Sequence, residues 1–269
     1  MTLPEKYTHL QEILRDMGSV LVAFSGGVDS TFVTKVARDV LRDAAQAATA
    51  WSENYPEISR AELTQLAEHL GIRHHLLTYN ELTIPHFEEN PPDRCYFCKH
   101  YLFNQFLRIA KEQGLRYVVD GSNADDVNDF RPGMRALQEL GIRSPLREAS
   151  LAKQDIRTLS QQLELPTWDK PSMPCLATRV PYGTPISPEV LHMIGEAEAF
   201  LRSLHFTHLR VRHHDHIARI EVTREEMLRI LTEQLDAQIV ARFKEIGYTY
   251  VTLDLQGFRS GSMNEVLAT

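Results

Sequence analysis

Ser25-Gly26-Gly27-Val28-Asp29-Ser30-Thr31 is the segment from which the architecture of this chain can be inferred. The apolar residues 20–24 precede it, and their β-branched and aromatic side chains are typical of a buried strand. Residues 31–41 follow with apolar side chains at helical spacing. This order of strand, glycine turn and helix predicts a phosphate-binding loop, because glycines let backbone N–H groups approach an anion and a helix N-terminus adds unpaired donors.

The glycine pattern separates this loop from the Walker loop, in which four residues lie between the glycines and a lysine follows. Here Gly26 and Gly27 are adjacent, and Asp29 stands where a lysine would be expected. Three hydroxyl side chains add further donors, namely Ser25, Ser30 and Thr31. The pattern resembles the pyrophosphate loop (PP-loop) of the N-type ATP pyrophosphatases, enzymes that cleave ATP between its α- and β-phosphates and adenylate a substrate.

The resemblance implies a role for each residue of the loop. The implied ATP-binding residues are Ser25, Gly26, Gly27, Asp29, Ser30 and Thr31, and Asp29 is also implied to act catalytically by holding Mg²⁺ on the leaving pyrophosphate. The alternative is an ordinary strand-to-helix turn. The paired glycines, the hydroxyls and the acid in matching positions argue against that alternative.

The composition indicates a globular protein of one large domain or two modest ones, with 269 residues of which 43% are hydrophobic. No apolar run reaches the length of a membrane span, and the polar first residues do not resemble a signal peptide. We therefore expect a cytoplasmic protein without a membrane partner. The net charge of −7 argues against a nucleic-acid-binding surface, which usually carries a basic excess.

Predicted strands and helices alternate along the first two thirds of the chain. The strands fall near residues 46–52, 73–78 and 117–121, and the helices near residues 58–70, 95–113 and 153–163. This alternation predicts an α/β fold, with a parallel twisted sheet and helices on both faces. Ligands of such sheets bind beyond the carboxyl ends of the strands, where the PP-loop and Gly121 are expected.

After Gly183 the pattern changes to that of a small α+β region. Helices are predicted over residues 187–204 and 236–246, strands over 209–213, 217–222 and 248–253, and a capping box at Thr223 opens one more helix. We therefore divide the chain into a PP-loop ATP pyrophosphatase domain, residues 1–183, and a C-terminal domain, residues 184–269, for substrate binding and oligomerisation.

Residues 122–129 (SNADDVND) follow a predicted strand with a run of acids and amides that does not suit a core. Three aspartates in five positions, Asp125, Asp126 and Asp129, suit contacts to Mg²⁺ or to a ribose. A solvated turn is the alternative for the same residues.

The chain has three cysteines, and an odd count without a secretion signal favours metal or sulfur chemistry over disulfides. Cys95 and Cys98 lie three apart at the start of a predicted helix, where two thiols can share a metal and are favoured as thiolates. Alone, this pair is compatible with a redox site, a zinc site or chance. Cys175 lies 77 positions after Cys98 (175 − 98), in a proline-rich stretch.

Five further motifs extend the resemblance over nearly the whole chain. They are residues 120–123 (DGSN), 128–133 (NDFRPG), 175–183 (CLATRVPYG), 209–214 (LRVRHH) and 257–261 (GFRSG). Together with the PP-loop they are similar to the LarE family, ATP-dependent sulfur transferases that make the nickel-pincer nucleotide cofactor of lactate racemase. Single motifs of this set are shared by many pyrophosphatases, but the set is not.

The resemblance implies a reaction in two stages on pyridinium-3,5-biscarboxylic acid mononucleotide. ATP first adenylates a carboxylate, and sulfur then displaces AMP to leave a thiocarboxylate. The implied cofactors are ATP, Mg²⁺ and, in family members with three cysteines, a [4Fe-4S] cluster that carries an extra sulfide. Gly121 is implied to bind ATP.

Cys95, Cys98 and Cys175 match the three-cysteine pattern, in which three thiolates hold the cluster and one iron stays open to exogenous sulfide. These cysteines would then be catalytic as well as metal-binding. One alternative is a sacrificial Cys175 that gives up its own sulfur. Another is zinc bound by the three thiolates and a histidine such as His100.

Strand alternation places Arg210 and Arg212 on one face, and planar guanidinium groups suit a phosphate. The resemblance implies that these two, with Arg179, bind the phosphate of the substrate. Glu198 and Glu221 match family acids and are predicted to bind a divalent ion. The alternative for the arginines is a solvated strand face paired with acids.

The implied partners are ATP, the pyridinium mononucleotide, and sulfide or a sulfur donor. The resemblance also implies a homo-oligomer, specifically a hexamer. A tRNA thiolase is the rival enzyme, but it would have to bind RNA with an acidic chain. The non-enzymatic alternative is a nucleotide-binding regulator that has lost catalysis and binds ATP without releasing pyrophosphate. The intact Asp29 and Ser30 argue against it.

Overall fold

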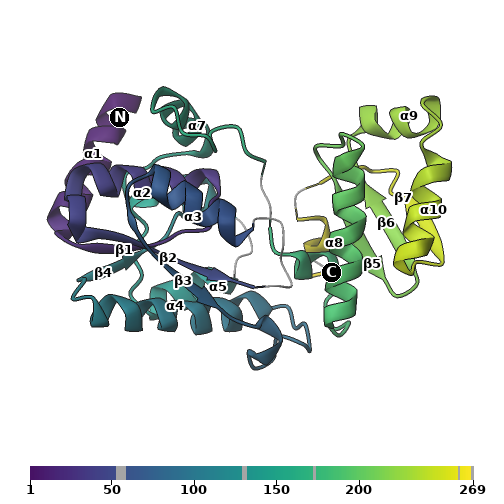
Figure 1. Ribbon diagram of the computed structural model, residues 1–269, viewed down its shortest axis with the longest axis horizontal. Coiled ribbons are helices and arrows are strands. Elements are labelled where there is room, and N and C mark those ends of the chain that lie inside the picture. Colours follow the sequence, from purple (N-terminus) through teal and green to yellow (C-terminus); the bar gives the residue numbers. More distant parts are fainter. Residues whose placement is uncertain (53–58, 129–131, 172–173, 260, 268–269) are drawn as a thin grey trace. The chain divides into compact units, whose positions relative to one another are not determined.

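The computed structural model describes residues 1–52, 59–128, 132–171, 174–259 and 261–267. The chain divides into two compact units (Figure 1). The first comprises Met1–Ser52, Ile58–Glu81 and Cys95–Ser172, and the second includes Leu82–Arg94 and Met173–Thr269. The second unit is therefore assembled from segments that are far apart in the sequence.

The first unit contains a four-stranded sheet in the order β3-β2-β1-β4, and every neighbouring pair is parallel. Its strands are β1 (Val20–Ala23), β2 (Ala45–Trp51), β3 (Arg73–Thr78) and β4 (Tyr117–Val119). β1 lies at the centre, since Val20 pairs with Ala45 on one side and with Tyr117 on the other. The predicted parallel α/β sheet is confirmed.

Helices cover both faces of this sheet, as predicted (Figure 1). The helices are α1 (Leu3–Met17), α2 (Val28–Leu41), α3 (Arg60–His69) and α7 (Lys153–Gln162) on one face, and α4 (Arg94–Glu112) and α5 (Pro132–Glu139) on the other. Successive side chains of β1 point to opposite faces of the sheet. Val20 and Val22 therefore pack into the hydrophobic core on the side of α1 and α2, and Leu21 packs into the core on the side of α4 and α5.

Two short helices were not predicted from the sequence, namely α5 and α6 (Pro145–Glu148). Both begin at a proline, whose fixed φ suits the first turn of a helix and whose missing N–H costs nothing there. A proline followed by a glycine, as at the start of α5, is typical of a turn in a sequence. The predicted site residue Asp129 and the motif residues 130, 131 and 260 lie outside the described part of the chain.

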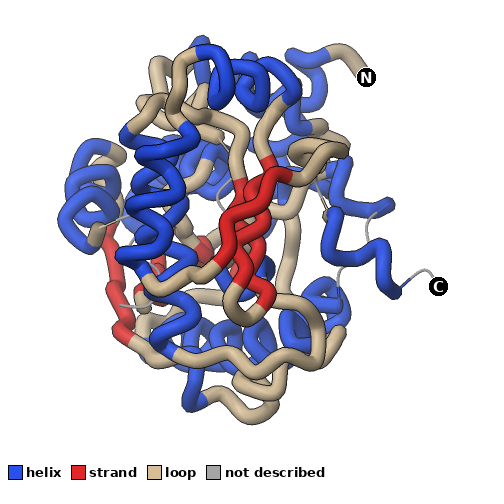
Figure 2. Tube along the Cα trace, turned by 90° about the vertical axis from the view of Figure 1, so that its right-hand side faces the viewer, coloured by secondary structure: helices blue, strands red, loops and turns tan. Residues whose placement is uncertain are grey.

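The second unit is built on a three-stranded sheet of β5 (Arg210–His214), β6 (Ile217–Glu221) and β7 (Tyr250–Leu253), the red group at the centre of Figure 2. β5 and β6 form an antiparallel hairpin, and β7 pairs with β6 in parallel. The helices are α8 (Pro188–Ser203), α9 (Arg224–Thr232) and α10 (Asp236–Ile246). The predicted capping box is present, because Thr223 Oγ1 accepts from Glu226 N at 3.2 Å and Glu226 Oε2 from Thr223 N at 3.0 Å.

A buried asparagine links the early and late segments of the second unit. Asn90 Nδ2 donates to the carbonyl oxygens of Val180 at 3.3 Å, Pro181 at 2.7 Å and Thr184 at 3.1 Å. Its Oδ1 accepts from the buried Arg94, which also donates to the Ala177 carbonyl oxygen at 3.1 Å. These bonds fix the loop between residues 177 and 184.

No helix among the described residues is long and apolar enough to span a membrane.

Candidate active site

The PP-loop joins the end of β1 to the start of α2. Ser30 Oγ lies 3.2 Å from Ser25 N and 3.0 Å from Ser25 Oγ, and it donates to the Gly27 carbonyl oxygen at 3.2 Å. Gly26 has φ +70°, a left-handed conformation that glycine adopts without steric cost. The closed loop thus leads into the first turn of α2, whose N–H groups lack acceptors within the helix. This is the construction of an anion site.

Gly121 follows β4 and lies directly beside this loop. A Cβ atom at position 121 would lie 3.0 Å from Ser30 N and 3.2 Å from Ser30 Cα, so the backbone at Ser30 would have to move by a few tenths of an ångström to admit it. The sheet therefore brings two predicted ATP-binding residues, Gly121 and Ser30, together at the carboxyl ends of β4 and β1. Glycine permits this close approach without any shift of the backbone.

Asp29 is the acid of the loop and lies in the first turn of α2. Its Oδ2 accepts a hydrogen bond from Lys153 Nζ at 2.7 Å, while its Oδ1 is buried and has no hydrogen-bond partner among the described residues. Burial raises the pKa of the Asp29 carboxyl above its usual value, although Lys153 opposes the rise. Asp29 thus has one oxygen paired with Lys153 and one buried oxygen without a hydrogen-bond partner among the described residues.

Two lysines that the sequence did not indicate as site residues contact the same loop. Lys153 is the first residue of α7, and Lys170 Nζ lies 3.4 Å from the Gly26 carbonyl oxygen. Arg157 of α7 donates to the carbonyl oxygens of Trp168 at 2.7 Å and Lys170 at 2.9 Å. Helix α7 therefore carries one ammonium group to the PP-loop and fixes the backbone that carries the other.

The aspartates that follow β4 accept hydrogen bonds from other residues of the first unit. Asp120 is buried and accepts hydrogen bonds from the hydroxyls of Ser122 and of Ser144, the latter at 2.6 Å. Asp125 and Asp126 accept bonds from backbone N–H groups at 2.8 and 2.9 Å. These contacts shape the loop beside the PP-loop, and a role in binding Mg²⁺ or ribose stays a prediction.

Cys95 and Cys98 lie in the first turns of α4, and both are half-buried. This part of α4 packs closely on α5, because a Cβ on Gly133 would lie 3.3 Å from the Cys95 carbonyl oxygen. The Arg135 guanidinium of α5 stacks over the Tyr96 ring, 4.0 Å from its centroid. The unpredicted helix α5 therefore fixes the turn that carries the two thiols.

Cys175 is exposed and directly precedes the short 3₁₀ helix Leu176–Arg179 of the second unit. The three cysteines thus come from two units, with Cys95 and Cys98 in the first. Within the described ranges, no three histidine, cysteine or acidic side chains are grouped closely enough to hold a metal ion. The iron–sulfur site stays a prediction.

Arg179 and Glu198 form a fully buried ion pair in the second unit. The guanidinium contacts the carboxylate through Nε at 2.8 Å and Nη2 at 2.9 Å, and its Nη1 donates to the Pro174 carbonyl oxygen at 2.7 Å. Glu198 also accepts from Arg202 Nη2 at 2.9 Å and Val211 N at 3.0 Å. Burial disfavours ionised Glu198, but Arg179, Val211 N and Arg202 hold its pKa below the usual value.

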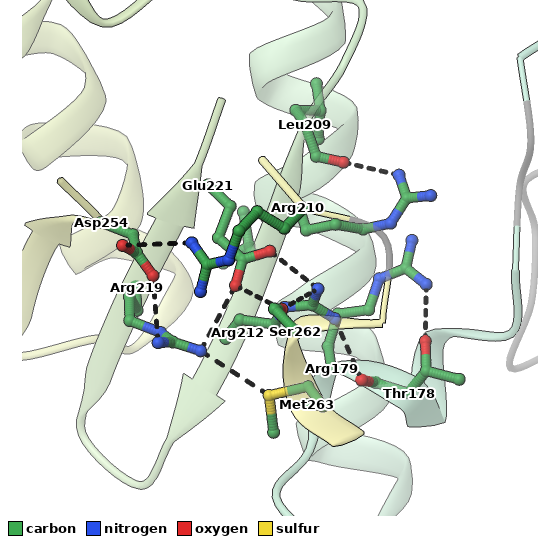
Figure 3. A network of polar contacts seen from close by, with 12 residues as sticks. Thr178, Arg179, Leu209, Arg210, Arg212, Arg219, Glu221, Asp254, Ser262 and Met263 are labelled. Atoms are coloured by element: carbon green, nitrogen blue, oxygen red, sulfur yellow. Dashed lines mark hydrogen bonds and ion pairs between the residues drawn. The ribbon is translucent and has the colours of Figure 1, made fainter. Parts of the chain in front are cut away.

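Figure 3 shows the predicted substrate-binding arginines Arg210 and Arg212 near Glu221, a predicted metal ligand that is buried. Arg212 Nη2 donates to Glu221 Oε2 at 2.7 Å and to Ser262 Oγ at 2.8 Å, and its Nη1 donates to the Thr178 carbonyl oxygen at 3.1 Å. Arg210 is half-buried, and its guanidinium group stacks over the Phe258 ring, 5.1 Å from the ring centroid.

These predicted substrate and metal residues lie near one another within the second unit. Arg179 and Arg212 both contact Thr178, and Glu198 binds the backbone N–H of the residue between the two strand arginines. The sequence indicated all five residues. It offered pairing with acids only as a solvated alternative for the strand arginines, and it did not indicate that Glu198 and Glu221 are the partners or that the pairs are buried. Their roles toward a substrate stay predictions.

Comparison with known proteins gives consistent matches over the whole chain. The family described as asparagine synthase matches residues 10–219. A pyridinium-3,5-bisthiocarboxylic acid mononucleotide synthase of Lactiplantibacillus plantarum is 40% identical over 99% of this chain and 96% of its own. An uncharacterized protein of Synechocystis sp. is 42% identical over 98% of this chain and 99% of its own, and one of Methanocaldococcus jannaschii is 30% identical over 90% and 91%.

Proposed function

This chain belongs to the PP-loop family, in its LarE branch of sulfur transferases, and from that premise we propose that it is an ATP-dependent sulfurtransferase. The proposed substrate is pyridinium-3,5-biscarboxylic acid mononucleotide, a carboxylate of which becomes a thiocarboxylate while ATP becomes AMP and pyrophosphate. The product would enter synthesis of the nickel-pincer nucleotide cofactor. The observation that carries this proposal is the closed PP-loop, with Asp29 in its first helical turn.

In the first step, a carboxylate oxygen of the substrate attacks the α-phosphorus of ATP. The new O–P bond forms as the bond to the bridging oxygen of pyrophosphate breaks, and that oxygen keeps the electron pair. Donors of Gly26, Gly27 and Ser30 would stabilise the charge that develops on the leaving group. Adenylation thereby converts a carboxylate oxygen, a poor leaving group, into part of AMP, which sulfur can displace.

Asp29 fits the Mg²⁺ that this reaction requires. Magnesium usually binds one or two carboxylates together with substrate phosphates, and the buried Asp29 Oδ1 lacks a hydrogen-bond partner among the described residues. When bound there, the ion would neutralise charge on the phosphates.

For the second step, we propose that Cys95, Cys98 and Cys175 hold a [4Fe-4S] cluster that carries sulfide from an external donor. Thiolates are the ligands of such clusters, and two of these cysteines begin α4, where a helix N-terminus favours the thiolate. Anaerobic analysis of iron and sulfide tests this assignment, with mass spectrometry of the chain after turnover. Iron-free protein that loses the mass of H₂S from one cysteine would indicate a sacrificial Cys175 instead.

We propose that Arg210, Arg212 and Arg179 surround the phosphate of the mononucleotide. Arg210 is suited to direct contact because it is only half-buried, whereas Arg179 and Arg212 already hold buried carboxylates. A divalent ion at Glu198 or Glu221 would have to displace a guanidinium group. Substrate binding and oligomerisation by residues 184–269 belong to the same proposal.

The decisive experiment incubates the purified chain with ATP, Mg²⁺ and the pyridinium biscarboxylate mononucleotide. We expect AMP and pyrophosphate in equal amounts, formed only when the carboxylate substrate is present. ADP in place of AMP, or no nucleotide cleavage at all, would refute the proposed function.

A further inference from the structure

The PP-loop has an aspartate where a Walker loop has a lysine, but two lysines from distant parts of the sequence contact the PP-loop. Lys153 Nζ lies 2.7 Å from Asp29 Oδ2, and Lys170 Nζ lies 3.4 Å from the Gly26 carbonyl oxygen. The partners are 124 and 144 residues apart in the sequence. Two ammonium groups therefore reach the loop through tertiary structure alone.

The position of Lys153 is held by its backbone as well as by its side chain. Lys153 N donates to Asp125 Oδ2 at 2.8 Å, and the Leu151 carbonyl oxygen accepts from Ala124 N at 2.9 Å. The loop after β4 and the start of α7 are therefore fastened together. A lysine fixed at its backbone and 35% exposed at its side chain can turn its ammonium group toward a ligand without moving the helix.

The ion pair between Asp29 and Lys153 is suited to a change in which Lys153 leaves the carboxylate and binds a phosphate. Asp29 offers Lys153 one oxygen only, in a site where burial already disfavours the ionised carboxylate. A triphosphate bound at the PP-loop brings several negative charges to the same place, and a lysine ammonium group is a point charge well suited to phosphate. Backbone N–H donors alone would leave much of that charge unbalanced.

We propose that Lys153 and Lys170 bind the β- and γ-phosphates of ATP and hold the pyrophosphate that leaves. Lys153 Nζ transfers its hydrogen bond from Asp29 to a phosphate oxygen, which releases the Asp29 carboxylate for the metal. Lys170 binds the other side of the same anion. No proton changes place, because the ammonium groups act only as donors while the bridging oxygen takes the electron pair of the broken bond.

This inference rests on the proposed AMP-forming activity, so its test uses binding without turnover. Isothermal titration calorimetry with the full chain measures the affinity for pyrophosphate in excess Mg²⁺. We expect Lys153→Met to weaken binding by about tenfold, as for loss of one charge-assisted hydrogen bond. Lys153→Arg keeps the charge and should bind more tightly than Lys153→Met, and Lys170→Met should bind more weakly than the unaltered chain.

Lys6→Met is the matched control. Lys6 Nζ forms an ion pair of 2.6 Å with Asp155 on the same helix α7, and both partners are similarly half-buried. This variant loses an ion pair of the same kind away from the PP-loop, so its pyrophosphate affinity should be unchanged. Circular dichroism melting of each variant shows whether it is folded.

Folded Lys153→Met and Lys170→Met proteins that bind pyrophosphate as tightly as the unaltered chain would overturn the inference. So would an unaltered chain that binds no pyrophosphate. Failure of the proposed function is read separately, as absence of AMP, and leaves the pyrophosphate titration interpretable.

Discussion

Asp29 in the first unit and Glu198 in the second are both carboxylates that face basic side chains, but they differ in how fully they are bonded. The side chain of Asp29 is 22% exposed, forms an ion pair with Lys153, and has a buried Oδ1 for which the described residues provide no hydrogen-bond partner. Glu198 is fully buried, and each of its oxygens accepts two hydrogen bonds.

The difference appears in the direction of the two pKa shifts. Burial raises the pKa of Asp29, and Lys153 and Asn123 together do not reverse the effect. Burial acts in the same direction on Glu198, but two arginines and a backbone N–H more than compensate, and its pKa is lowered. A carboxylate with few partners can take a ligand, whereas one with every lone pair occupied holds its surroundings in place.

Removal of Glu198 should have the largest effect. Glu198→Ala leaves Arg179 buried without its carboxylate, and breaking a buried pair in this way costs about 3–5 kcal/mol of unfolding free energy. Urea unfolding followed by circular dichroism measures the loss. Glu196→Ala on the same helix is the control, because Glu196 pairs with Arg242 at an exposed site and should cost less than about 1 kcal/mol. Equal losses in the two variants would contradict the comparison.

Removal of Asp29 should affect catalysis more than stability. Asp29→Ala is expected to lower the rate of pyrophosphate release by about 100-fold, the scale seen when a group that stabilises a transition state is lost. Asp39→Ala is the control, since Asp39 pairs with Lys35 on the same helix α2 at 2.6 Å. A coupled assay of pyrophosphate measures both variants. An undiminished rate in Asp29→Ala would remove this residue from the mechanism.

Crowding of the PP-loop should have a smaller effect than loss of its acid. Gly121→Ala places a methyl group 3.0 Å from Ser30 N, so the loop must shift. Overpacking of this kind costs about 1–3 kcal/mol, and we expect the KM for ATP to rise by about tenfold. Gly195→Ala, whose new methyl group would make an ordinary contact of 3.4 Å, should leave this KM unchanged. A normal KM in Gly121→Ala would show that the loop can relax at little cost.

The smallest effect concerns how stability depends on pH. The pKa of Asp29 is raised from 3.8 in the folded protein. Between pH 3.8 and this raised pKa, the native state keeps a proton that the unfolded chain has lost, so stability falls as pH rises through this window. Glu198 acts in the opposite sense, since its lowered pKa gives stability that is present above 4.5 and lost as pH falls.

The variant Asp29→Asn isolates the first of these two contributions. It should be slightly more stable than the unaltered chain at neutral pH, with the difference vanishing at and below pH 3.8. Glu198→Gln should instead be less stable at neutral pH. Urea unfolding at a series of pH values measures both, and a destabilised Asp29→Asn at neutral pH would contradict the expected direction of the effect.

The sequence predicted the elements whose signals are local. The PP-loop, the parallel strands and the capping box at Thr223 each depend on residues close together in the chain, and each is confirmed. The family resemblance is confirmed as well, by the match with the Lactiplantibacillus plantarum synthase. Helix α5 was missed because a proline followed by a glycine is typical of a turn.

Contacts between distant residues could not be predicted in the same way. Lys153 and Lys170 carry no motif, and nothing in their neighbourhood marks them as partners of a loop more than 100 residues earlier. Arg179 and Glu198 were both indicated, but their pairing depends on how α8 packs on the preceding 3₁₀ helix. The functional roles of the cysteines and arginines remain predictions from the resemblance.

The amide of Asn90 carries a consequence for how the protein is made. Its acceptors lie 90 or more positions later in the chain, so the ribosome must add a further third of the sequence before this buried group can be satisfied. Folding of the second unit must wait for that late segment, because Asn90 has no acceptors before it is made. Contacts of such long range also close slowly. A nascent chain that stops short of residue 180 would expose the Asn90 region to chaperones and proteases.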